Sequence, residues 1–417
     1  MSPAAKPRVL LLTQWFDPEP TFKGLVFARE LVRQGFEVEV VTGFPNYPGG
    51  KVYPGYKIKL IQRERIDGVE VTRLPLYPNH DQSAIKRVLN YASFAASALV
   101  YGLFMAKRAD VMYAYHPPLT VGVAASLIRW VRGIPLVYDI QDMWPDTLRA
   151  TGMLDNPQLL SLVGLVCKWV YRQVDHLVVL SPGFKRLLVQ RGVAESKIDV
   201  IYNWADESSL IAPVGSVPVT FPGTDRFRVV FAGNMGKAQA LDAVLDAAEI
   251  LQARGARATL VMLGGGVEVN RLKARALEIK LMNVVFLPPV TMAEVGTVLA
   301  AADLLLVHLR KDPLFEITIP SKTQAYMAVG KPLLMAVNGD AADLVMQAQC
   351  GLIAESENPQ ALADAVEALS TMPIDQLKKM GDKAGRFYRE SLGLEVGVTK
   401  FAAVFDSLHK KARRKEK

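Results

Sequence analysis

The stretch FRVVFAGNMGKAQALDAVLDAAEILQARGARATLVMLGGG, residues 227–266, holds a complete strand–helix–strand unit. Its short apolar runs at 227–233 and 258–266 are typical of buried strands. Between them, residues 240–255 place apolar side chains at helical spacing. A helix that joins two strands carries the chain back to the end of the sheet at which the first strand began. The second strand then runs in the same direction, so this unit predicts parallel strands.

The same alternation of strands and helices continues in both directions along the chain. Further strands are predicted at 8–16, 36–44, 110–116, 135–141, 176–181, 284–290 and 302–309, and further helices at 25–35 and 269–280. Repeated strand–helix alternation predicts parallel sheets covered by helices on both faces. The expected fold class is α/β, with two Rossmann-like, doubly wound parallel-sheet domains that face each other across a cleft.

A segment rich in Pro, Gly and Ser, residues 205–226, separates the two halves and shows no periodicity. We therefore expect an N-terminal Rossmann-like domain at 1–205 and a second one at 206–385. The remaining residues, 386–417, are expected to form a C-terminal helix, which can pack back on the N-terminal domain, and a basic tail.

Length and composition fit a two-domain intracellular protein. The chain has 417 residues, of which 50% are hydrophobic and 22% charged, enough apolar material for large cores. Its two cysteines, Cys167 and Cys350, suit a reducing compartment. The first apolar run is too short for a signal peptide. The expected location is the cytoplasm, at the inner face of the cytoplasmic membrane for the reasons that follow.

Two features suggest contact with an anionic membrane. The net charge is +8, and the tail KKARRKEK (410–417) is strongly basic. The tail can equally be a solubilising terminus, whereas nucleic acid is a weaker alternative because no binding module accompanies the charge. Residues 88–106 carry no charge and lie between basic pairs at 86–87 and 107–108. They can form a core helix, an interfacial helix or, least of the three, a membrane span.

Several familiar catalytic motifs are missing from the sequence. The segment GNMGKA (233–238) lacks the spacing and hydroxyl of a P-loop. The glycines at 264–266 do not form a dinucleotide fingerprint, no Asp-x-Asp pair is present, and the five histidines lack ligand spacing. The sequence therefore predicts neither a metal nor an organic cofactor.

Two predicted strand-to-helix connections of the second domain have the features of an anion site. Gly233, Asn234, Gly236 and Lys237 follow a predicted strand, where backbone N–H groups and a helix dipole can face a phosphate. An ordinary strand-to-helix turn also favours glycine, so this stretch alone leaves both interpretations open.

The second connection, FEITIPSKTQAYMAVGKP (315–332), carries Glu316 in a loop and then a new helix. Either Ser321 at the N-cap or Pro320 at the first helical position would begin that helix. Lys322 then falls in the first turn, where it opposes the helix dipole unless an anion is near. This conflict favours a binding role, with a solvated surface lysine as the alternative.

In the first domain, polar residues follow two predicted strands. His116 ends one strand, and Asp142, beside Trp144, follows the next. Ligands in open α/β sheets bind at the carboxyl ends of strands. Asp142 is a candidate base or hydroxyl anchor, although a loop-capping carboxylate is an alternative, and His116 can be a structural donor.

Six motifs occur in order along the chain and together carry a family resemblance. They are TGFPNYPGGKVYPGY (42–56), DMWPD (142–146), SPGFKRLL (181–188), IYNWAD (201–206), GNMGKAQAL (233–241) and IPSKTQAYMAVGKPLL (319–334). This set resembles glycosyltransferase family 4, in the bacterial surface-polysaccharide branch that includes N-acetyl-L-fucosamine transferases. The resemblance extends from about residue 8 to residue 390.

The resemblance implies a GT-B fold and a retaining, metal-independent transfer of a sugar from a UDP donor, with an acetamido sugar expected. The implied acceptor is linked to a polyprenyl diphosphate. Lys237 and Lys322 would be the counter-charges of the diphosphate, and Glu316 would contact the donor sugar. The implied donor site comprises Gly233, Asn234, Gly236, Lys237, Glu316, Ser321, Lys322, Thr323 and Gln324. The implied acceptor side comprises Lys23, Gly24, His116, Asp142 and Trp144, of which His116 and Asp142 are also catalytic candidates.

The sequence departs from the family at one position. The family has a second glutamate, on the nucleotide ribose, and the spacing from Glu316 places Gln324 there. Either Gln324 or backbone groups would then bind the ribose. Two other functions stay open at this point: a nucleotide-sugar epimerase or hydrolase of the same fold, and a non-catalytic scaffold of a polysaccharide assembly complex.

Overall fold

A computed structural model describes residues 6–79, 84–210, 221 and 226–415 of the chain. It divides into two compact units, of which unit 1 comprises Met1–Tyr202 with Gly397–Lys417 and unit 2 comprises Asn203–Val396. The predicted boundary after residue 205 lies close to this division. Of the predicted linker, residues 211–220 and 222–225 lie outside the described part, and a short helix, α7 (Glu207–Leu210), occupies its start.

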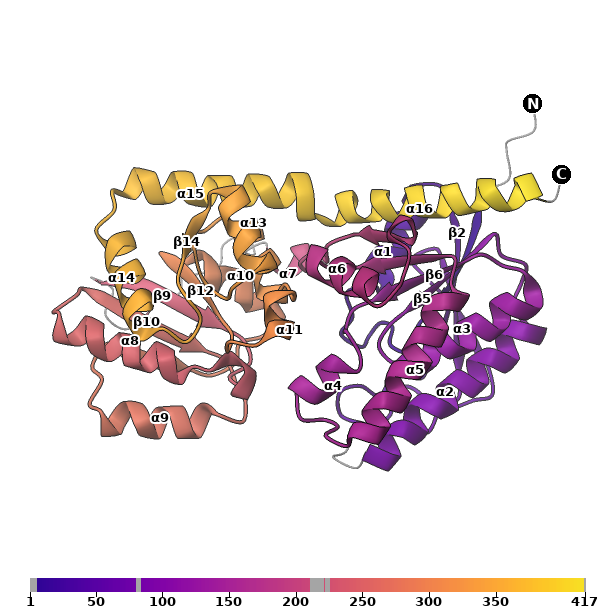
Figure 1. Cartoon of the computed structure of the whole chain (residues 1–417), viewed down its shortest axis with the longest axis horizontal. Helices are drawn as coiled ribbons and strands as arrows, with labels where there is room; N and C mark the ends of the chain where they lie inside the picture. The colour runs from indigo at the N-terminus through magenta and orange to yellow at the C-terminus, as the bar shows by residue number, and fades with distance from the viewer. Residues whose placement is uncertain (1–5, 80–83, 211–220, 222–225, 416–417) are drawn as a thin grey trace. The chain divides into compact units, whose positions relative to one another are not determined.

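Unit 1 is built on an eight-stranded sheet of order β3-β4-β2-β1-β5-β6-β7-β8, in which only the β3–β4 pair is antiparallel (Figure 1). Its strands are β1 (Arg8–Leu12), β2 (Glu37–Gly43), β3 (Gln62–Ile66), β4 (Val69–Leu74), β5 (Val111–Tyr115), β6 (Leu136–Ile140), β7 (His176–Val179) and β8 (Ile198–Val200). Every residue of β5 and β6 is buried, as expected for parallel strands covered on both faces.

Helices connect these strands. They are α1 (Leu25–Arg33), α2 (Ala84–Phe104), α3 (Leu119–Arg132), α4 (Asp146–Ala150), α5 (Pro157–Gln173), α6 (Pro182–Gln190) and the 3-10 turn η1 (Glu195–Lys197). Local sequence sets two of their starts. The Asn156 side chain accepts the N–H groups of residues 158 and 159, and Ser181 Oγ accepts the N–H of Phe184. Both caps are followed by proline at the first helical position.

The uncharged segment 88–106 forms most of α2, which packs on unit 1 through one side. Phe94 and Ala98 are fully buried, whereas Val88 and Val100 on the other side are 61% and 56% exposed. In the described part of the chain, no helix combines the length and hydropathy that a bilayer crossing requires. Core packing and interfacial contact therefore both remain compatible with α2.

The last helix, α16 (Leu394–Lys415), belongs to unit 1 from Gly397 onward. Phe401 packs edge-on against Phe27 of α1 and Tyr113 of β5, at ring distances of 5.2 and 5.6 Å. Phe405 packs against Phe36 at 6.1 Å. The end of the chain therefore completes the core of the unit that the beginning of the chain starts.

Unit 2 has a six-stranded parallel sheet of order β11-β10-β9-β12-β13-β14. Its strands are β9 (Phe227–Ala232), β10 (Ala258–Leu263), β11 (Val284–Leu287), β12 (Leu304–His308), β13 (Leu333–Ala336) and β14 (Gly351–Ile353). Its further helices are η2 (Lys237–Gln239), α8 (Asp242–Ala253), α9 (Val269–Glu278), α10 (Met292–Ala300), α11 (Pro313–Glu316), α12 (Ser321–Val329), α13 (Asp340–Ala348), α14 (Pro359–Ser370), α15 (Ile374–Phe387) and the π-helical turn η3 (Tyr388–Leu392). The predicted strand–helix–strand unit at 227–266 is β9, α8 and β10.

The core of unit 2 includes a cluster of buried residues from β9, β10, α8 and α14. Leu251 of α8 lies in this cluster and is fully buried, whereas Leu277 on α9 is 80% exposed. Unit 2 therefore has one helical leucine in its core and one at its surface.

Leu251→Ala is expected to lower the free energy of unfolding of unit 2 by about 2–5 kcal/mol, because it leaves a cavity in a closely packed core. Leu277→Ala is the matched control and should change it by about 0.5 kcal/mol or less. Denaturant unfolding followed by circular dichroism measures both. Equal losses in the two variants would contradict the placement of α8 in the core.

Candidate functional site

The sheet of unit 2 has its switch point between β9 and β12. The chain runs from β9 through β10 to β11 on one side and then returns to place β12 on the other side. Strands β9 and β10 pair over their whole length, whereas β9 and β12 pair only at 229–230 with 304–305. Beyond that point the two central strands cease to pair. Ligands of doubly wound sheets bind at such a switch point, beside the carboxyl ends of the strands.

A tyrosine replaces the missing strand partner at this point. The hydroxyl of Tyr326 on α12 accepts the backbone N–H of Ala232 at 2.9 Å and donates to the carbonyl oxygen of the same residue at 3.2 Å. Tyr326 is fully buried, so neither group of Ala232 is left without a partner. The pair of bonds fixes α12 to the end of β9.

Lys322 lies one helical turn before Tyr326 and therefore on the same side of α12. A Cβ atom placed on Gly233 would lie 3.5 Å from its Nζ, and Gly233 has φ +128°. The Nζ atom lies 3.7 Å from the centroid of the Phe231 ring. It is buried and makes no hydrogen bond within the described residues, and burial lowers the pKa of Lys322 to about 7. An unpartnered buried amine beside a glycine loop is the strongest indication of an anion site in unit 2.

The loop after β9 is held in place from β12. The Nδ1–H of His308 donates to the carbonyl oxygen of Gln239 at 2.6 Å, and the backbone N–H of Arg310 donates to that of Ala238 at 2.9 Å. His308 Nε2 accepts the N–H of Glu357 at 3.3 Å, and burial lowers the pKa of His308. The neutral imidazole with its proton on Nδ1 satisfies both contacts.

The predicted donor-loop residues lie at the open end of this arrangement. Gly233, Asn234 and Lys237 are exposed, and the buried Gly236 donates its N–H to Gln239 Oε1 at 2.9 Å. The loop after β10 approaches closely, because a Cβ atom on Gly264 would collide with the carbonyl oxygen of Gly233. The structure thus brings the predicted loop and Lys322 together at the carboxyl end of β9.

Glu316 differs from its predicted setting, because it ends the short helix α11 and does not lie in a loop. It is half-buried, and its carboxylate makes no hydrogen bond or ion pair within the described residues. Gly339, with φ +77°, packs so closely on its carbonyl oxygen that a Cβ atom there would collide with it. The Glu316 carboxylate is therefore available to a ligand, and its contact with the donor sugar stays a prediction.

The start of α12 corrects two details of the prediction. Pro320 is the N-cap, Ser321 is the exposed first helical residue, and no side chain caps this helix. Thr323 and Gln324 face the interior and are 0% and 2% exposed. In the orientation that its neighbours favour, the Gln324 amide donates to the carbonyl oxygens of Pro320 and Ser321, at 2.9 and 3.2 Å. This local role of its nitrogen disfavours the predicted ribose contact through Gln324.

In unit 1 the switch point lies between β1 and β5, and His116 follows β5 there. The ring of His116 is buried and lies edge-on to Trp144 and Tyr138, at 5.3 and 5.9 Å. Burial lowers the pKa of His116 to about 3, so the imidazole is neutral at physiological pH. Its Nδ1 makes no hydrogen bond within the described residues. His116 and Trp144, both predicted on the acceptor side, thus lie together.

Asp142 lies beyond the end of β6, where burial raises its pKa to about 6. Its carboxylate makes no hydrogen bond or ion pair within the described residues. Burial raises the pKa of Tyr91, and the Asp142 carboxylate acts in the same direction, so the two groups are neighbours. A carboxyl group with a pKa near neutrality and no internal partner suits proton exchange with a ligand hydroxyl.

An aromatic group that the sequence did not lead us to expect lies at this end of the unit 1 sheet. The rings of Trp15 and Tyr47 stack at 4.6 Å, and Tyr91 lies edge-on to Trp15 at 6.4 Å. All three are half-buried. Aromatic side chains in NYPGG and TQWF, directly after two strands, were the available signal. That these three rings pack together could not be foreseen, because they come from three distant segments of the chain.

Two predicted acceptor-side residues, Lys23 and Gly24, make contacts inside unit 1, and their contact with an acceptor stays a prediction. Lys23 is fully buried, with its Nζ 5.1 Å from the centroid of the Phe401 ring. Burial lowers the pKa of Lys23 to about 8, against the opposing effect of Asp139. Gly24 precedes α1, and a Cβ atom there would collide with the Asp17 carboxylate, which accepts the N–H of Leu25 at 2.6 Å.

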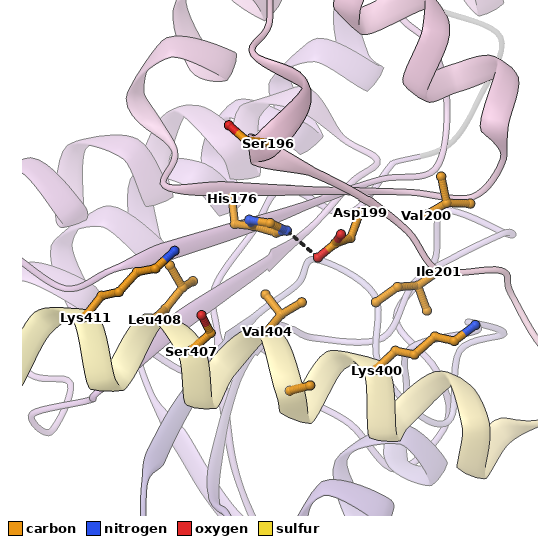
Figure 2. A pocket seen from close by; sticks show the side chains of 11 residues that line it. His176, Ser196, Asp199, Val200, Ile201, Lys400, Val404, Ser407, Leu408 and Lys411 are labelled. Atoms are coloured by element: carbon orange, nitrogen blue, oxygen red, sulfur yellow. Dashed lines mark hydrogen bonds and ion pairs between the residues drawn. The ribbon is translucent and has the colours of Figure 1, made fainter.

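A groove elsewhere in unit 1 is separate from the predicted acceptor-side residues. It has a volume of about 360 Å³ and runs between the edge strand β8 and α16. In Figure 2, His176 points toward Asp199, and its Nε2 lies 2.9 Å from the carboxylate. The carboxyl ends of β1, β5 and β6 do not line it. Among the described residues, no group of three His, Cys, Asp or Glu side chains is arranged to hold a metal.

Two family profiles match the chain. One, described as a Glycosyl transferase 4-like domain, matches residues 25–204. The other, described as Glycosyl transferases group 1, matches residues 218–387. The chain belongs to glycosyltransferase family 4, as its motifs predicted.

Two relatives match over about three quarters of their length. WbjE of Pseudomonas aeruginosa, named as a glycosyltransferase, is 25% identical over 307 residues, which cover 72% of this chain and 74% of WbjE. WcaI of Escherichia coli, named as a colanic acid biosynthesis glycosyl transferase, is 27% identical over 311 residues, which cover 72% of this chain and 75% of WcaI.

Solved structures share the fold. Sucrose-phosphate synthase from Thermosynechococcus elongatus has a TM-score of 0.74 at 15% identity, over 97% of this chain and all of that one. HepE of Anabaena, solved in complex with UDP, has a TM-score of 0.69 at 16% identity, over 96% of this chain and all of HepE. The GT-B prediction, with two parallel-sheet α/β domains, is therefore confirmed.

Tyr326→Phe tests how the site of unit 2 is built. Removing the hydroxyl leaves the N–H and carbonyl oxygen of Ala232 buried and unpaired, which should lower the free energy of unfolding by about 1–3 kcal/mol. Tyr56→Phe is the control, because no hydrogen bond of its hydroxyl is found within the described residues. Denaturant unfolding compares the two, and equal stabilities would show that the hydroxyl does not hold α12.

Proposed function

We propose that this chain transfers a sugar from a UDP-sugar to a lipid-linked acceptor in the biosynthesis of a bacterial polysaccharide, with retention of anomeric configuration. The observation that carries the proposal is the buried, unpartnered amine of Lys322 beside Gly233 at the switch point of unit 2. The complex of HepE with UDP and the name of WcaI support the donor and the pathway class.

In the transfer, the bond between the anomeric carbon and the β-phosphate oxygen breaks, and its electrons go to the departing UDP. The acceptor hydroxyl oxygen forms the new bond to the anomeric carbon on the same face of the sugar. Its proton passes to the departing phosphate or to Asp142. The sugar itself is expected to be an acetamido sugar, and the acceptor a polyprenyl-diphosphate-linked sugar.

Lys322 can supply charge to the departing diphosphate because its own protonation responds to the ligand. Burial holds its pKa near 7 in the free protein. A diphosphate next to the amine would raise that pKa, because an opposite charge favours the protonated form. Lys237 at the exposed end of the loop is the second expected counter-charge. Such preorganised charges act where the transition state becomes negative, and this needs no metal ion.

Lys322→Met is expected to lower kcat with the best donor of a UDP-sugar panel by about 10²–10³-fold, because the leaving group loses its buried counter-charge. Release of UDP in the presence of a bacterial lipid extract measures the rate. Lys273→Met, an exposed lysine on α9, is the control and should retain the wild-type rate. A folded Lys322→Met variant with unchanged kcat would refute the assigned role.

The affinity for UDP should fall as the pH rises through about 7, because the free amine loses its proton there while the complex needs it. Between pH 7 and pH 9 the loss should be at least about tenfold. Calorimetric titration with UDP measures it, together with proton uptake on binding at pH 8. Lys322→Met should remove this dependence, and a wild-type affinity that stays constant would contradict the mechanism.

The same measurements separate the other two functions. An epimerase or hydrolase would turn over a UDP-sugar at the same rate without lipid extract. A scaffold with a degenerate site would not bind UDP at all. A transferase binds UDP and forms a glycosylated lipid only when the extract is present.

A further inference from the structure

Three helices of unit 1, α2, α3 and α5, form one layer with an apolar outer side. The helices α2 and α3 contact each other, and α3 also contacts α5 (Figure 1). Thr120 at the start of α3 donates to the carbonyl oxygen of Tyr91, and Arg132 at its end donates to that of Gly102. These contacts show that α2 and α3 run in the same direction and that α3 lies alongside the part of α2 from Tyr91 to Gly102.

The outward side of this layer carries large apolar side chains. On α2, every fourth residue from Val88 to Phe104 is exposed, and each of them is apolar. We define the three-helix face by the six residues Val100, Phe104, Trp130, Leu162, Leu165 and Trp169, which are 56%, 79%, 77%, 57%, 63% and 38% exposed. Several large exposed apolar side chains on neighbouring helices mark an interaction site, whereas single exposed residues do not.

The three helices contain basic but no acidic residues, although Arg129 of α3 is ion-paired with Asp175 beyond the end of α5. Each of the three helices contains two basic residues. Apolar residues together with basic ones, on helices that lie along a surface, are the composition of segments that bind at the interface of an anionic bilayer. A second copy of the chain is a poor occupant, because it would bring the same positive charges against these.

A groove beside α5 extends this positive character. It has a volume of about 830 Å³, and its lining includes Lys168, Arg172, Arg191 and Lys197. No carboxylate of the described residues lines it, although Arg191 is ion-paired with Asp146 and Lys197 donates to the carbonyl oxygen of Tyr171. Lys168 and Arg172 are therefore the charges offered to a ligand. Trp144, which packs against His116, lines the same groove. The groove therefore joins the layer of the three-helix face to the predicted acceptor side of unit 1.

We propose that the three-helix face lies on an anionic lipid bilayer, with its apolar side chains in the acyl boundary and lipid phosphates in the groove beside α5. This inference rests on the proposed function, because a lipid-linked acceptor has to be reached at a membrane. It differs from the expectation drawn from the sequence, since four of the six residues of the three-helix face belong to α3 and α5 and the basic tail is not required.

The test uses the full chain and vesicles of phosphatidylcholine containing about one third phosphatidylglycerol. The triple variant Phe104→Ser, Trp130→Ser, Leu165→Ser should bind these vesicles about 100-fold more weakly than wild type, because it removes three large apolar contacts. The matched control replaces Leu277, Met282 and Ile374 of unit 2 with serine. Those residues are 80%, 84% and 83% exposed, so the control removes as much exposed apolar surface and should bind as wild type does.

Charge is tested separately with Lys168→Gln, Arg172→Gln. This variant should lose about tenfold in affinity for the anionic vesicles, and wild type should bind pure phosphatidylcholine far more weakly than the mixture. Equal loss in the serine control, undiminished binding by the triple variant, or a dimer in sedimentation velocity that the triple variant abolishes would each overturn the proposal.

Calorimetric titration with UDP keeps this proposal separate from the proposed function. The triple variant should bind UDP with wild-type affinity, because the candidate donor site lies in unit 2. A wild-type circular dichroism spectrum and an unfolding transition at the wild-type position show that unit 1 is folded as well. If wild type fails to bind UDP but binds vesicles through the three-helix face, the proposed function fails and the membrane surface stands. If UDP binds but the triple variant still binds vesicles, the proposal for the three-helix face fails and the proposed function stands.

Discussion

The bonds between the Tyr326 hydroxyl and the backbone of Ala232 hold the candidate donor site together. Strands β9 and β12 stop pairing just before Ala232, so one polar edge of β9 would otherwise be buried without partners. The hydroxyl satisfies that edge and at the same time fixes α12. Lys322, one turn earlier on the same helix, is thereby placed beside Gly233, and its amine makes no hydrogen bond within the described part of the chain. The interrupted pairing of β9 with β12 and the position of the buried Lys322 amine thus depend on the same local arrangement.

Unit 1 shows the opposite treatment of buried charge. Lys23 is surrounded by protein and has Asp139 as its counter-charge, and Asp139 accepts hydrogen bonds from Tyr113 and Gln141 at 2.6 Å each. Such internal partners make a charged pair part of the core. Within the described residues, Asp142 and Lys322 have no hydrogen-bond or ion-pair partner, although burial shifts the pKa of both toward neutrality. The absence of such partners, more than the shift itself, distinguishes these two candidate binding groups from the structural pair.

The fold could be predicted from the sequence because its signals are local. Buried strands appear as short apolar runs, and proline with Asn156 or Ser181 marks the start of a helix. The glycine loop at Gly233 and the basic side chain of Lys322 could also be recognised in the sequence. Gly233 directly follows a predicted strand, and Lys322 lies in the first turn of a predicted helix. The internal contacts of Lys23 and Gly24 could not be foreseen, because they depend on Asp139 and Asp17, which only the folded chain brings near. The Trp15, Tyr47 and Tyr91 cluster was missed for the same reason.

The return of α16 to unit 1 affects how the protein is made. Phe401 covers Phe27, Tyr113 and the buried amine of Lys23, yet it lies near the very end of the chain. During synthesis the ribosome releases all of unit 2 before this residue emerges. Unit 1 therefore completes its core only after the whole of unit 2 has been synthesised.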